Sequence, residues 1–503
     1  MNSVTRRNRF HADVDGAFDV AIVGGGVQGA CLYHLLSRRG YRVLLVEQHD
    51  FGGGTSQASA TLVWGGLLYL RNLDVMEVVR LSAARDRLLR DHSGRVRPRF
   101  WSYVFGERRS QSPWVLRGGL WVYWLLGGGR RARPVYLRDF PERGFLKDQR
   151  AIECLRFEEG QMQVSDARFV YDWIALGDNE RSSAVNYCSL RGGGYDTEGR
   201  VWRLELHDEL SGAQKEVRAK WVVNCAGVWA DGVNQRFGIK LPYRHLLAKG
   251  VSFTFARPSG HRDTIALDGK AADAGLSLVP WGPVSLWGST ETVVESPEQG
   301  WSASKDEVQF LLDELNAYLR RPIGCEDIVA LRCGVRPLVA PHGRWKGDAM
   351  QLSKRWRVHR DNHVPWISVH GGKLTACCSV ARRVGDILAR VLGEAEAARD
   401  DHERQSAPLT LFAGLEVPSH RWCNEHEDCW KLDDYLRRRT NIAQWIPRGG
   451  LGAQDEHREQ LRAIAADLCG GDGQRGDAML LEYVSRVRDE HDRVLGQGKE
   501  TAI

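Results

Sequence analysis

The first clear pattern in the chain is an alternation of short apolar runs with a stretch of helical spacing. Residues 20–23 are all apolar and are followed at once by glycines, which is typical of a strand buried on both faces of a parallel sheet. Residues 31–39 carry apolar side chains at helical spacing and end at Gly40. Residues 41–47 form a second apolar run that ends on an acid, so the order predicts one βαβ unit.

The pattern continues through the middle of the chain and changes near residue 395. Further helices are expected at residues 71–90, 305–319 and 375–392, and further strands at residues 201–206 and 216–223. Beyond residue 395 the chain is rich in charged residues and alanine, and helical spacing returns at residues 432–439 and 454–468. We therefore expect a main region at residues 15–394 and a C-terminal helical domain at residues 395–503, joined by a polar linker at residues 394–405.

The glycines after the first strand have the spacing of a dinucleotide-binding turn. Gly24, Gly26 and Gly29 fit G-x-G-x-x-G between a strand and a helix. Gly24 permits the tight turn, Gly26 lets the backbone approach a diphosphate, and Gly29 allows close packing of helix on strand. Glu47 ends the next strand, where an acid accepts hydrogen bonds from ribose hydroxyls and repels the 2′-phosphate of NADP. These elements do not separate FAD from NAD.

Composition narrows the classes of function. The net charge is +6, the hydrophobic share is 43%, and no Lys/Arg tract is long enough to indicate nucleic-acid binding. The first residues lack the apolar stretch of a secretory signal, so we expect a cytoplasmic protein. The 11 cysteines form no C-x-x-C pair, which predicts neither a zinc nor an iron–sulfur site. Adjacent Cys377 and Cys378 are expected to be buried small side chains, with a redox pair as the alternative.

Five segments, in order along the chain, resemble the FAD-dependent glycerol-3-phosphate dehydrogenases. They are GTSQASATLVWGGLLYL at residues 54–70, NCAGVW at 224–229, CGVRPL at 333–338, GGKLT at 371–375 and LRRRT at 436–440. The resemblance implies an α/β fold, with a Rossmann-like, doubly wound FAD-binding domain interleaved with an antiparallel-sheet substrate domain. It also implies non-covalent FAD, and it favours FAD over NAD because NAD enzymes do not need the later segments, which face a flavin in this family.

The resemblance and the glycine turn together give a set of residues expected to bind the cofactor. They are Gly24, Gly26, Gly29, Glu47, Thr55, Ser56, Gly65, Gly66, Ala226, Gly227, Gly371, Gly372, Lys373, Leu374 and Thr375. Gly371 and Gly372 let backbone approach a flat ring, and the helix after them directs its positive end at the flavin edge that gathers charge on reduction.

The resemblance gives three expected catalytic residues, and a departure from the family pattern gives a fourth, His370. Arg336 is expected to bind an anionic or hydroxyl group of the substrate, and Lys373 to hold a phosphate or stabilise reduced flavin. Tyr69 matches the family. His370 precedes the two glycines and is expected to replace a missing base, with a hydrogen-bonded loop histidine as the alternative. Arg332 is a further candidate for an anion contact.

Other positions depart from the family pattern. Trp64 stands where the family has His, Leu68 where it has Arg, and Ser252 where it has His; Lys354 or Arg355 stands for a further Arg, and Ala376-Cys377-Cys378 replaces Thr-Tyr-Arg. Each lost charge-assisted contact to a phosphate costs ~1.5–3 kcal/mol. We therefore expect a related substrate that is larger or less anionic than glycerol 3-phosphate.

Three functions stay open at this point. The first is a dehydrogenase that removes a hydride from a C–OH carbon of a small anionic polyol, with quinone or another carrier as electron acceptor. The second is an FAD-dependent amine or amino-acid oxidase of the same fold. The third is a flavin-binding protein that has lost catalysis, as Trp64 and Leu68 would permit.

One apolar and aromatic segment raises the question of a membrane. Residues 114–126 are too short to span a bilayer and are followed by Arg130, Arg131 and Arg133. An interfacial element is consistent with indoles at the headgroups and arginines on phosphates. The resemblance also suggests peripheral attachment, at the inner face of the membrane, and the alternative is a buried helix between the FAD-binding and substrate domains.

Overall fold

The first sheet of the protein is built around the predicted βαβ unit. The computed structural model describes residues 7–8, 10–12, 16–107, 109–268, 275–341, 355–397 and 406–496. Within these ranges the central order is β17 (Arg357–Arg360), β18 (Trp366–His370), β10 (Gln214–Asn224), β1 (Phe18–Val23), β2 (Val43–Val46) and β7 (Ser183–Val185), with the hairpin β8 (Cys188–Asp196) and β9 (Val201–Asp208) paired to β10 through β9. Strands β18, β10, β1, β2 and β7 are parallel, so their carboxyl ends meet at one edge.

Alternate side chains of β1 enter two different cores. Val20 and Ile22 pack with helices α2 (Val27–Arg38), α5 (Asp166–Gly177) and α9 (Cys377–Leu392), which cover one face of the sheet. Ala21 and Val23 pack on the other face against β8, β9 and the region of α6 (Ala230–Arg236). Burial on both faces explains why the apolar runs of β1 and β2 are continuous.

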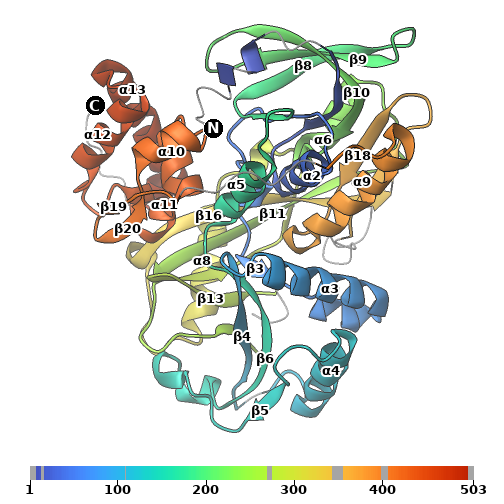
Figure 1. The fold of residues 1–503 in the computed structure, drawn as a ribbon. Coiled ribbons are helices and arrows are strands. Elements are labelled where there is room, and N and C mark those ends of the chain that lie inside the picture. The colour runs from blue at the N-terminus through green and yellow to red at the C-terminus, as the bar shows by residue number, and fades with distance from the viewer. Residues whose placement is uncertain are drawn as a thin grey trace.

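A second, largely antiparallel sheet is interleaved with the first along the chain. Among the described residues its order is β15 (Thr292–Val294), β11 (Tyr243–Ala256), β14 (Val284–Gly288), β13 (Ser277–Trp281), β12 (Thr264–Leu267), β4 (Val96–Phe105), β6 (Glu153–Met162) and β3 (Leu62–Val63), with β16 (Ile328–Pro341) on β11 and β5 (Val135–Leu137) on β6. Helix α8 (Lys305–Asn316) buries Val308, Leu311 and Leu315 in its core. Figure 1 shows this sheet below the first, with α3 (Val75–Asp91) and α4 (Pro113–Leu126) at its side.

The C-terminal part of the chain is mainly helical and has its own core. It contains the hairpin β19 (Leu409–Phe412) and β20 (Leu415–Pro418) and helices α10 (His420–His426), α11 (Ile442–Trp445), α12 (Arg458–Leu468), α13 (Gly473–Val487) and α14 (Arg493–Leu495). The guanidinium groups of Arg438 and Arg439 both reach the buried carboxylate of Asp50, each at 2.7 Å, and so tie this part to the end of the βαβ unit.

The predicted α/β architecture is confirmed, and several predicted element boundaries are corrected. The helix expected from residue 71 begins at Val75, because residues 67–72 form a 3-10 turn, Leu73 is left-handed, and Asp74 caps the helix. The helix expected at residues 432–439 is a π-helix at Asp434–Arg439. Part of the expected linker, residues 398–405, lies outside the described residues, so the domain boundary stays a prediction.

Candidate functional site

The glycine turn after β1 is packed as the motif requires. A side chain on Gly24, whose φ is +106°, would place its Cβ 2.6 Å from the carbonyl oxygen of Cys225, and a Cβ on Gly29 would lie 1.9 Å from the carbonyl oxygen of Gly24. Gly26 is different, because its Cβ would meet only the hydroxyl of Ser56, at 3.3 Å. Gly24 and Gly29 thus allow close packing, and Gly26 borders open space at the start of α2.

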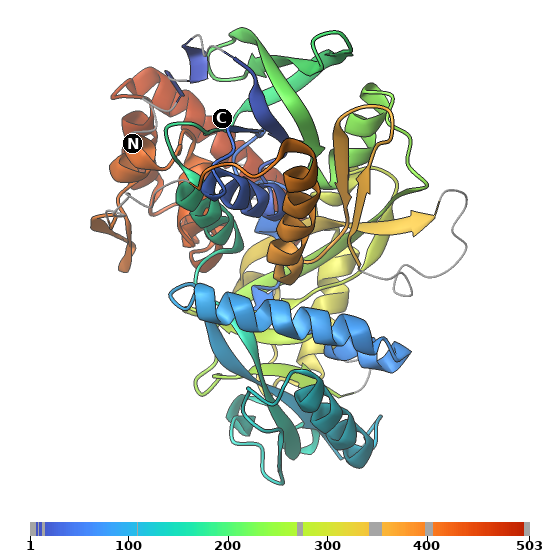
Figure 2. The ribbon, with the colours of Figure 1, turned by 45° about the vertical axis from the view of Figure 1, so that its right-hand side comes forward.

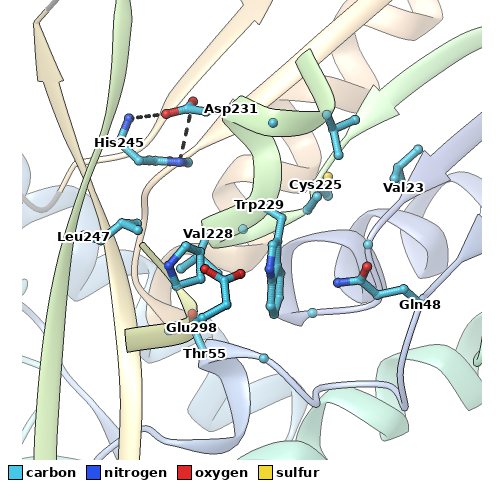
Figure 3. A pocket seen from close by; sticks show the side chains of 18 of the residues that line it. Val23, Gln48, Thr55, Cys225, Val228, Trp229, Asp231, His245, Leu247 and Glu298 are labelled. Carbon is cyan, nitrogen blue, oxygen red and sulfur yellow. Dashed lines mark hydrogen bonds and ion pairs between the residues drawn. The ribbon is translucent and has the colours of Figure 1, made fainter. Parts of the chain in front are cut away.

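That open space is a cavity of about 740 Å³ at the carboxyl edge of the parallel sheet (Figure 3). Its walls include Gly24, Gly26, Glu47, Thr55, Ser56, Ala226 and Gly227, all of them predicted cofactor-binding residues. Trp229 stands across the middle of the cavity in Figure 3 and stacks on Trp301 with ring centres 5.8 Å apart. The volume lies in the range of small-molecule and cofactor pockets.

Hydrogen bonds from backbone N–H groups hold two polar side chains, Glu47 and Ser56, at the cavity wall. Glu47 accepts the backbone N–H groups of Gly25 at 2.7 Å and His49 at 2.8 Å, and burial raises the pKa of its carboxyl group. The Ser56 hydroxyl accepts the backbone N–H of Val27 at 3.0 Å, at the first turn of α2. These bonds fix Glu47 and Ser56 at the cavity wall, where their contacts with a cofactor stay predictions.

The predicted ring-facing turn has the expected backbone. Gly371 and Gly372 have φ values of +64° and +94°, which only glycine adopts readily, and a 3-10 turn at Leu374–Ala376 leads into α9. A Cβ on Gly372 would lie 3.1 Å from the side-chain amide nitrogen of Gln28, so this turn faces the dinucleotide loop at residues 24–29. The hydroxyl of Thr375 accepts the backbone N–H of Trp64 at 3.0 Å and joins the turn to residues 54–70.

Lys373 lies between two aromatic rings beside this turn. Its ammonium is 4.6 Å from the ring centre of Trp64 and 4.7 Å from that of Tyr69, within cation–π range of both. The indole N–H of Trp64 and the hydroxyl of Tyr69 are buried and have no hydrogen-bond partner among the described residues. Burial raises the pKa of Tyr69 far above its usual range, so at neutral pH its hydroxyl is a hydrogen-bond donor and not a base.

Arg336 and Arg332 point to different partners. The Arg336 guanidinium donates to the carbonyl oxygen of Thr290 at 3.2 Å and to the hydroxyl of Ser289, and burial lowers its pKa. Arg332 is fully buried and forms an ion pair with Asp166 at 2.8 Å. Arg332 is therefore committed to a carboxylate of the protein, and the expectation that it offers an anion contact to the substrate is wrong.

His370 lies in a cluster with Asp231 and His245, in which the two imidazoles are buried and Asp231 is partly exposed. Its Nε2 is 2.8 Å from the carboxylate of Asp231, and its ring centre is 4.3 Å from that of His245. His245 in turn accepts the backbone N–H of Gly371 at 3.2 Å through Nε2. Figure 3 shows Asp231 and His245 side by side at one end of the cavity. The cluster holds the start of the ring-facing turn, and the base role of His370 stays a prediction.

Four further residues singled out from the sequence are Gly65, Gly66, Arg355 and Lys354. Gly65 donates its backbone N–H to Glu159 at 3.1 Å, and a Cβ there would lie 2.3 Å from the hydroxyl of Tyr123, so packing alone accounts for this glycine. Gly66 has a φ of +89° at the start of the turn that carries Tyr69. Arg355 pairs with Asp74. Lys354 lies outside the described residues.

Sequence analysis missed Asp231, His245 and Gln28. Asp231 lies two residues after the segment 224–229, and Gln28 occupies one of the unspecified positions of the glycine motif. The neighbouring motifs could therefore have pointed to both residues. His245 gave no signal, because β11 brings it to Gly371 across 126 residues of chain.

The His245 environment predicts a pH dependence of stability. Burial, followed by the charge of His370, lowers the pKa of His245 to about 3 from a usual value of 6.5. The unfolded chain therefore takes up a proton as the pH falls through 6.5 while the folded chain does not, so stability is complete above pH 6.5 and falls towards pH 3. We expect the wild type to lose up to about 1.4 kcal/mol more per pH unit than His245→Gln in this window, measured by chemical unfolding. Equal slopes would contradict the prediction.

Comparison with known proteins identifies the family. Residues 19–386 match the family described as "DAO: FAD dependent oxidoreductase". The chain is 26% identical over 400 residues to the aerobic glycerol-3-phosphate dehydrogenase of Staphylococcus saprophyticus, covering 78% of this chain and 70% of that protein. It is 27% identical over 375 residues to the D-erythritol 1-phosphate dehydrogenase of Brucella abortus, covering 73% and 72%.

A solved structure of a similar protein has the same fold. The structure of the glycerol-3-phosphate dehydrogenase from Bacillus halodurans complexed with FAD superposes with a TM-score of 0.72 and 17% identity over 100% of both chains. Two observations on this protein fit FAD: the backbone at Gly26 borders a cavity at the start of α2, and the turn at Gly372 lies beside the unpartnered polar atoms of Trp64 and Tyr69. The chain therefore belongs to the FAD dependent oxidoreductase family, and FAD is its cofactor.

Proposed function

We propose that this enzyme oxidises a C–OH carbon of a small anionic polyol, with FAD accepting the hydride and a quinone or a similar carrier reoxidising it. The observation that carries the proposal is Lys373, a cation stacked between Trp64 and Tyr69 beside the turn predicted to face the flavin. An ammonium in that position attracts a phosphate or carboxylate of the substrate. The relatives named for glycerol 3-phosphate and D-erythritol 1-phosphate support a phosphorylated polyol.

The other residues of the site have distinct proposed roles. Tyr69, which stays protonated, donates a hydrogen bond to a substrate oxygen. The backbone N–H groups at the start of α9 stabilise the negative charge that the reduced ring system gathers. His370 is fully buried with Nε2 facing Asp231, so a proton taken from the substrate hydroxyl would have to reach Nδ1, which has no partner among the described residues. Arg336 contributes positive charge from the side of Ser289.

Flavin reduction by candidate substrates tests this proposal. Under anaerobic conditions, erythritol phosphate is expected to bleach the flavin absorbance faster than the smaller glycerol 3-phosphate, and unphosphorylated erythritol at the same concentration is expected to do so at least ~10-fold more slowly than its phosphate. Stopped-flow absorbance measures these rates. Bleaching by amino acids or amines, with peroxide formed on turnover in air, would instead support an oxidase. No bleaching by any of these compounds would support a flavin-binding protein without this activity.

We also propose that α3 and α4 rest on a membrane surface. The two helices lie side by side in Figures 1 and 2 and expose Met76, Trp114, Val115, Val122 and Leu125, and Leu73 just before α3 is exposed too. Arg117 stacks on Trp114, and Arg130 and Arg133 follow α4. Such an apolar face with arginines at its edge suits an interface with anionic lipids. Within the described ranges, no helix has the length and apolar character to cross a bilayer.

Liposome binding tests the membrane proposal. The double variant Trp114→Ser, Leu125→Ser is expected to lose most of the binding to anionic vesicles, since both side chains are exposed and removing them takes away apolar area that would enter the lipid. Trp124 is not a suitable target, because its indole donates to the carbonyl oxygen of Arg131 at 2.9 Å. The matched control is Leu481→Ser on α13, which removes an equally exposed side chain elsewhere. Unchanged sedimentation of the double variant would exclude this face.

A further inference from the structure

Three cysteine thiols meet where α2 packs against the start of α9. Cys31 belongs to α2, and Cys377 and Cys378 are the first two residues of α9. The sulfur of Cys378 lies 4.0 Å from that of Cys31 and 4.0 Å from that of Cys377, and all three sulfurs lie within 4.8 Å of one another. All three are free thiols. Figures 1 and 2 show α2 and α9 packed side by side, and the cysteines come together across 347 residues of chain.

The 4.0 Å separations of the Cys378 sulfur from those of Cys31 and Cys377 match a trigonal metal site, and the third separation is below 4.8 Å. With metal–sulfur bonds of about 2.3 Å, three sulfurs around one ion stand about 4.0 Å apart in a plane. Thiolate ligands select soft ions such as Cu⁺ and Zn²⁺. Cys31 and Cys377 are almost completely buried, whereas Cys378 is half-buried and gives an ion a path of entry.

We propose that Cys31, Cys377 and Cys378 form a three-thiolate site for one soft metal ion of the Cu⁺, Zn²⁺ and Cd²⁺ class. Binding joins one ion to the three sulfurs as the thiols give up their protons, with no change of oxidation state. The ion ties α2, which follows the dinucleotide loop, to α9, which follows the ring-facing turn. The spacing of cysteines along the sequence predicts no metal site, since Cys31 lies far from the other two in the chain.

The experiment uses the reduced, FAD-loaded enzyme without oxygen and Cd²⁺ as a visible probe. We expect an ultraviolet thiolate-to-cadmium absorption band that saturates at one ion per chain, with release of protons recorded by a pH indicator. Cu⁺, and Zn²⁺ in excess, should each compete with Cd²⁺ and weaken the cadmium band. Loading should raise the thermal unfolding temperature, because an ion that binds only the folded chain stabilises it.

Single serine variants separate this site from the other cysteines. Cys31→Ser, Cys377→Ser and Cys378→Ser should each raise the dissociation constant for Cd²⁺ at least ~10-fold. The half-exposed cysteines outside the cluster supply matched controls, Cys325→Ser and Cys469→Ser, which should keep the band. Cys378→Ser keeps the test valid if the buried variants fail to fold, and flavin content shows which variants are folded. A band that survives in folded Cys378→Ser, no band at one equivalent, or a disulfide between Cys31 and Cys378 in place of metal uptake would overturn the proposal.

Discussion

Replacing Gly26 with valine is expected to give a folded chain that purifies without flavin. The backbone of Gly26 has a φ of −73° and a ψ of −178°, which any residue adopts, so the substitution introduces no backbone strain. The Cβ of the new side chain meets only the hydroxyl of Ser56, and the cavity lies beside it at the first turn of α2. A diphosphate there loses the N–H groups of the helix start, and two such contacts at ~1.5–3 kcal/mol each correspond to a ~100-fold or larger loss of FAD affinity.

The visible absorbance of the purified chain and its thermal unfolding measure the two halves of this prediction. Gly94→Val is the matched control, because a Cβ at this exposed glycine meets nothing within 4 Å and the residue lies outside the cavity. The control should remain yellow. If Gly26→Val binds FAD as tightly as the wild type, the diphosphate does not lie on this backbone, and the assignment of the cavity fails.

Local motifs carried most of what the sequence could predict. Gly24 and Gly29 were predictable because each packs within the motif's own unit or on the strand beside it, and sequence spacing alone determines that geometry. The parallel strands were predictable because burial on both faces requires continuous apolar runs. The start of α3 was not, because Asp74 caps it after a left-handed Leu73, and helical spacing does not register such a break.

Contacts between distant residues account for the errors. Arg332 was expected to bind the substrate because the sequence shows its charge but does not show its ion-pair partner. That partner, Asp166, lies 166 residues away in the chain. Trp64 was interpreted as the loss of a family histidine, yet its indole forms one wall around Lys373, 309 positions on by residue number. A substitution that removes one polar group from a site can bring a new contact to another residue of that site. Only the tertiary structure shows which residue makes that contact.

Lys373 gives the sharpest prediction about catalysis. Lys373→Met keeps an unbranched side chain of similar length between Trp64 and Tyr69 but removes the charge. Because the proposed anion contact contributes ~1.5–3 kcal/mol, kcat/KM for a phosphorylated polyol should fall ~10–150-fold, while FAD content stays near that of the wild type. Steady-state assays with an artificial electron acceptor measure the change. Lys220→Met, which removes an exposed lysine paired with Asp19, is the matched control and should leave kcat/KM unaltered.

The substrate series then separates substrate binding from flavin chemistry. If Lys373 contacts the anion, Lys373→Met should lose discrimination between a phosphorylated and an unphosphorylated polyol, because the deleted charge no longer favours either one. If Lys373 acts only on the reduced flavin, both substrates should slow by the same factor and the flavin reduction potential should fall. Lys373→Arg, which keeps the charge between the two rings, should restore part of the discrimination in the first case. An unchanged kcat/KM for Lys373→Met with every substrate would remove this residue from the reaction altogether.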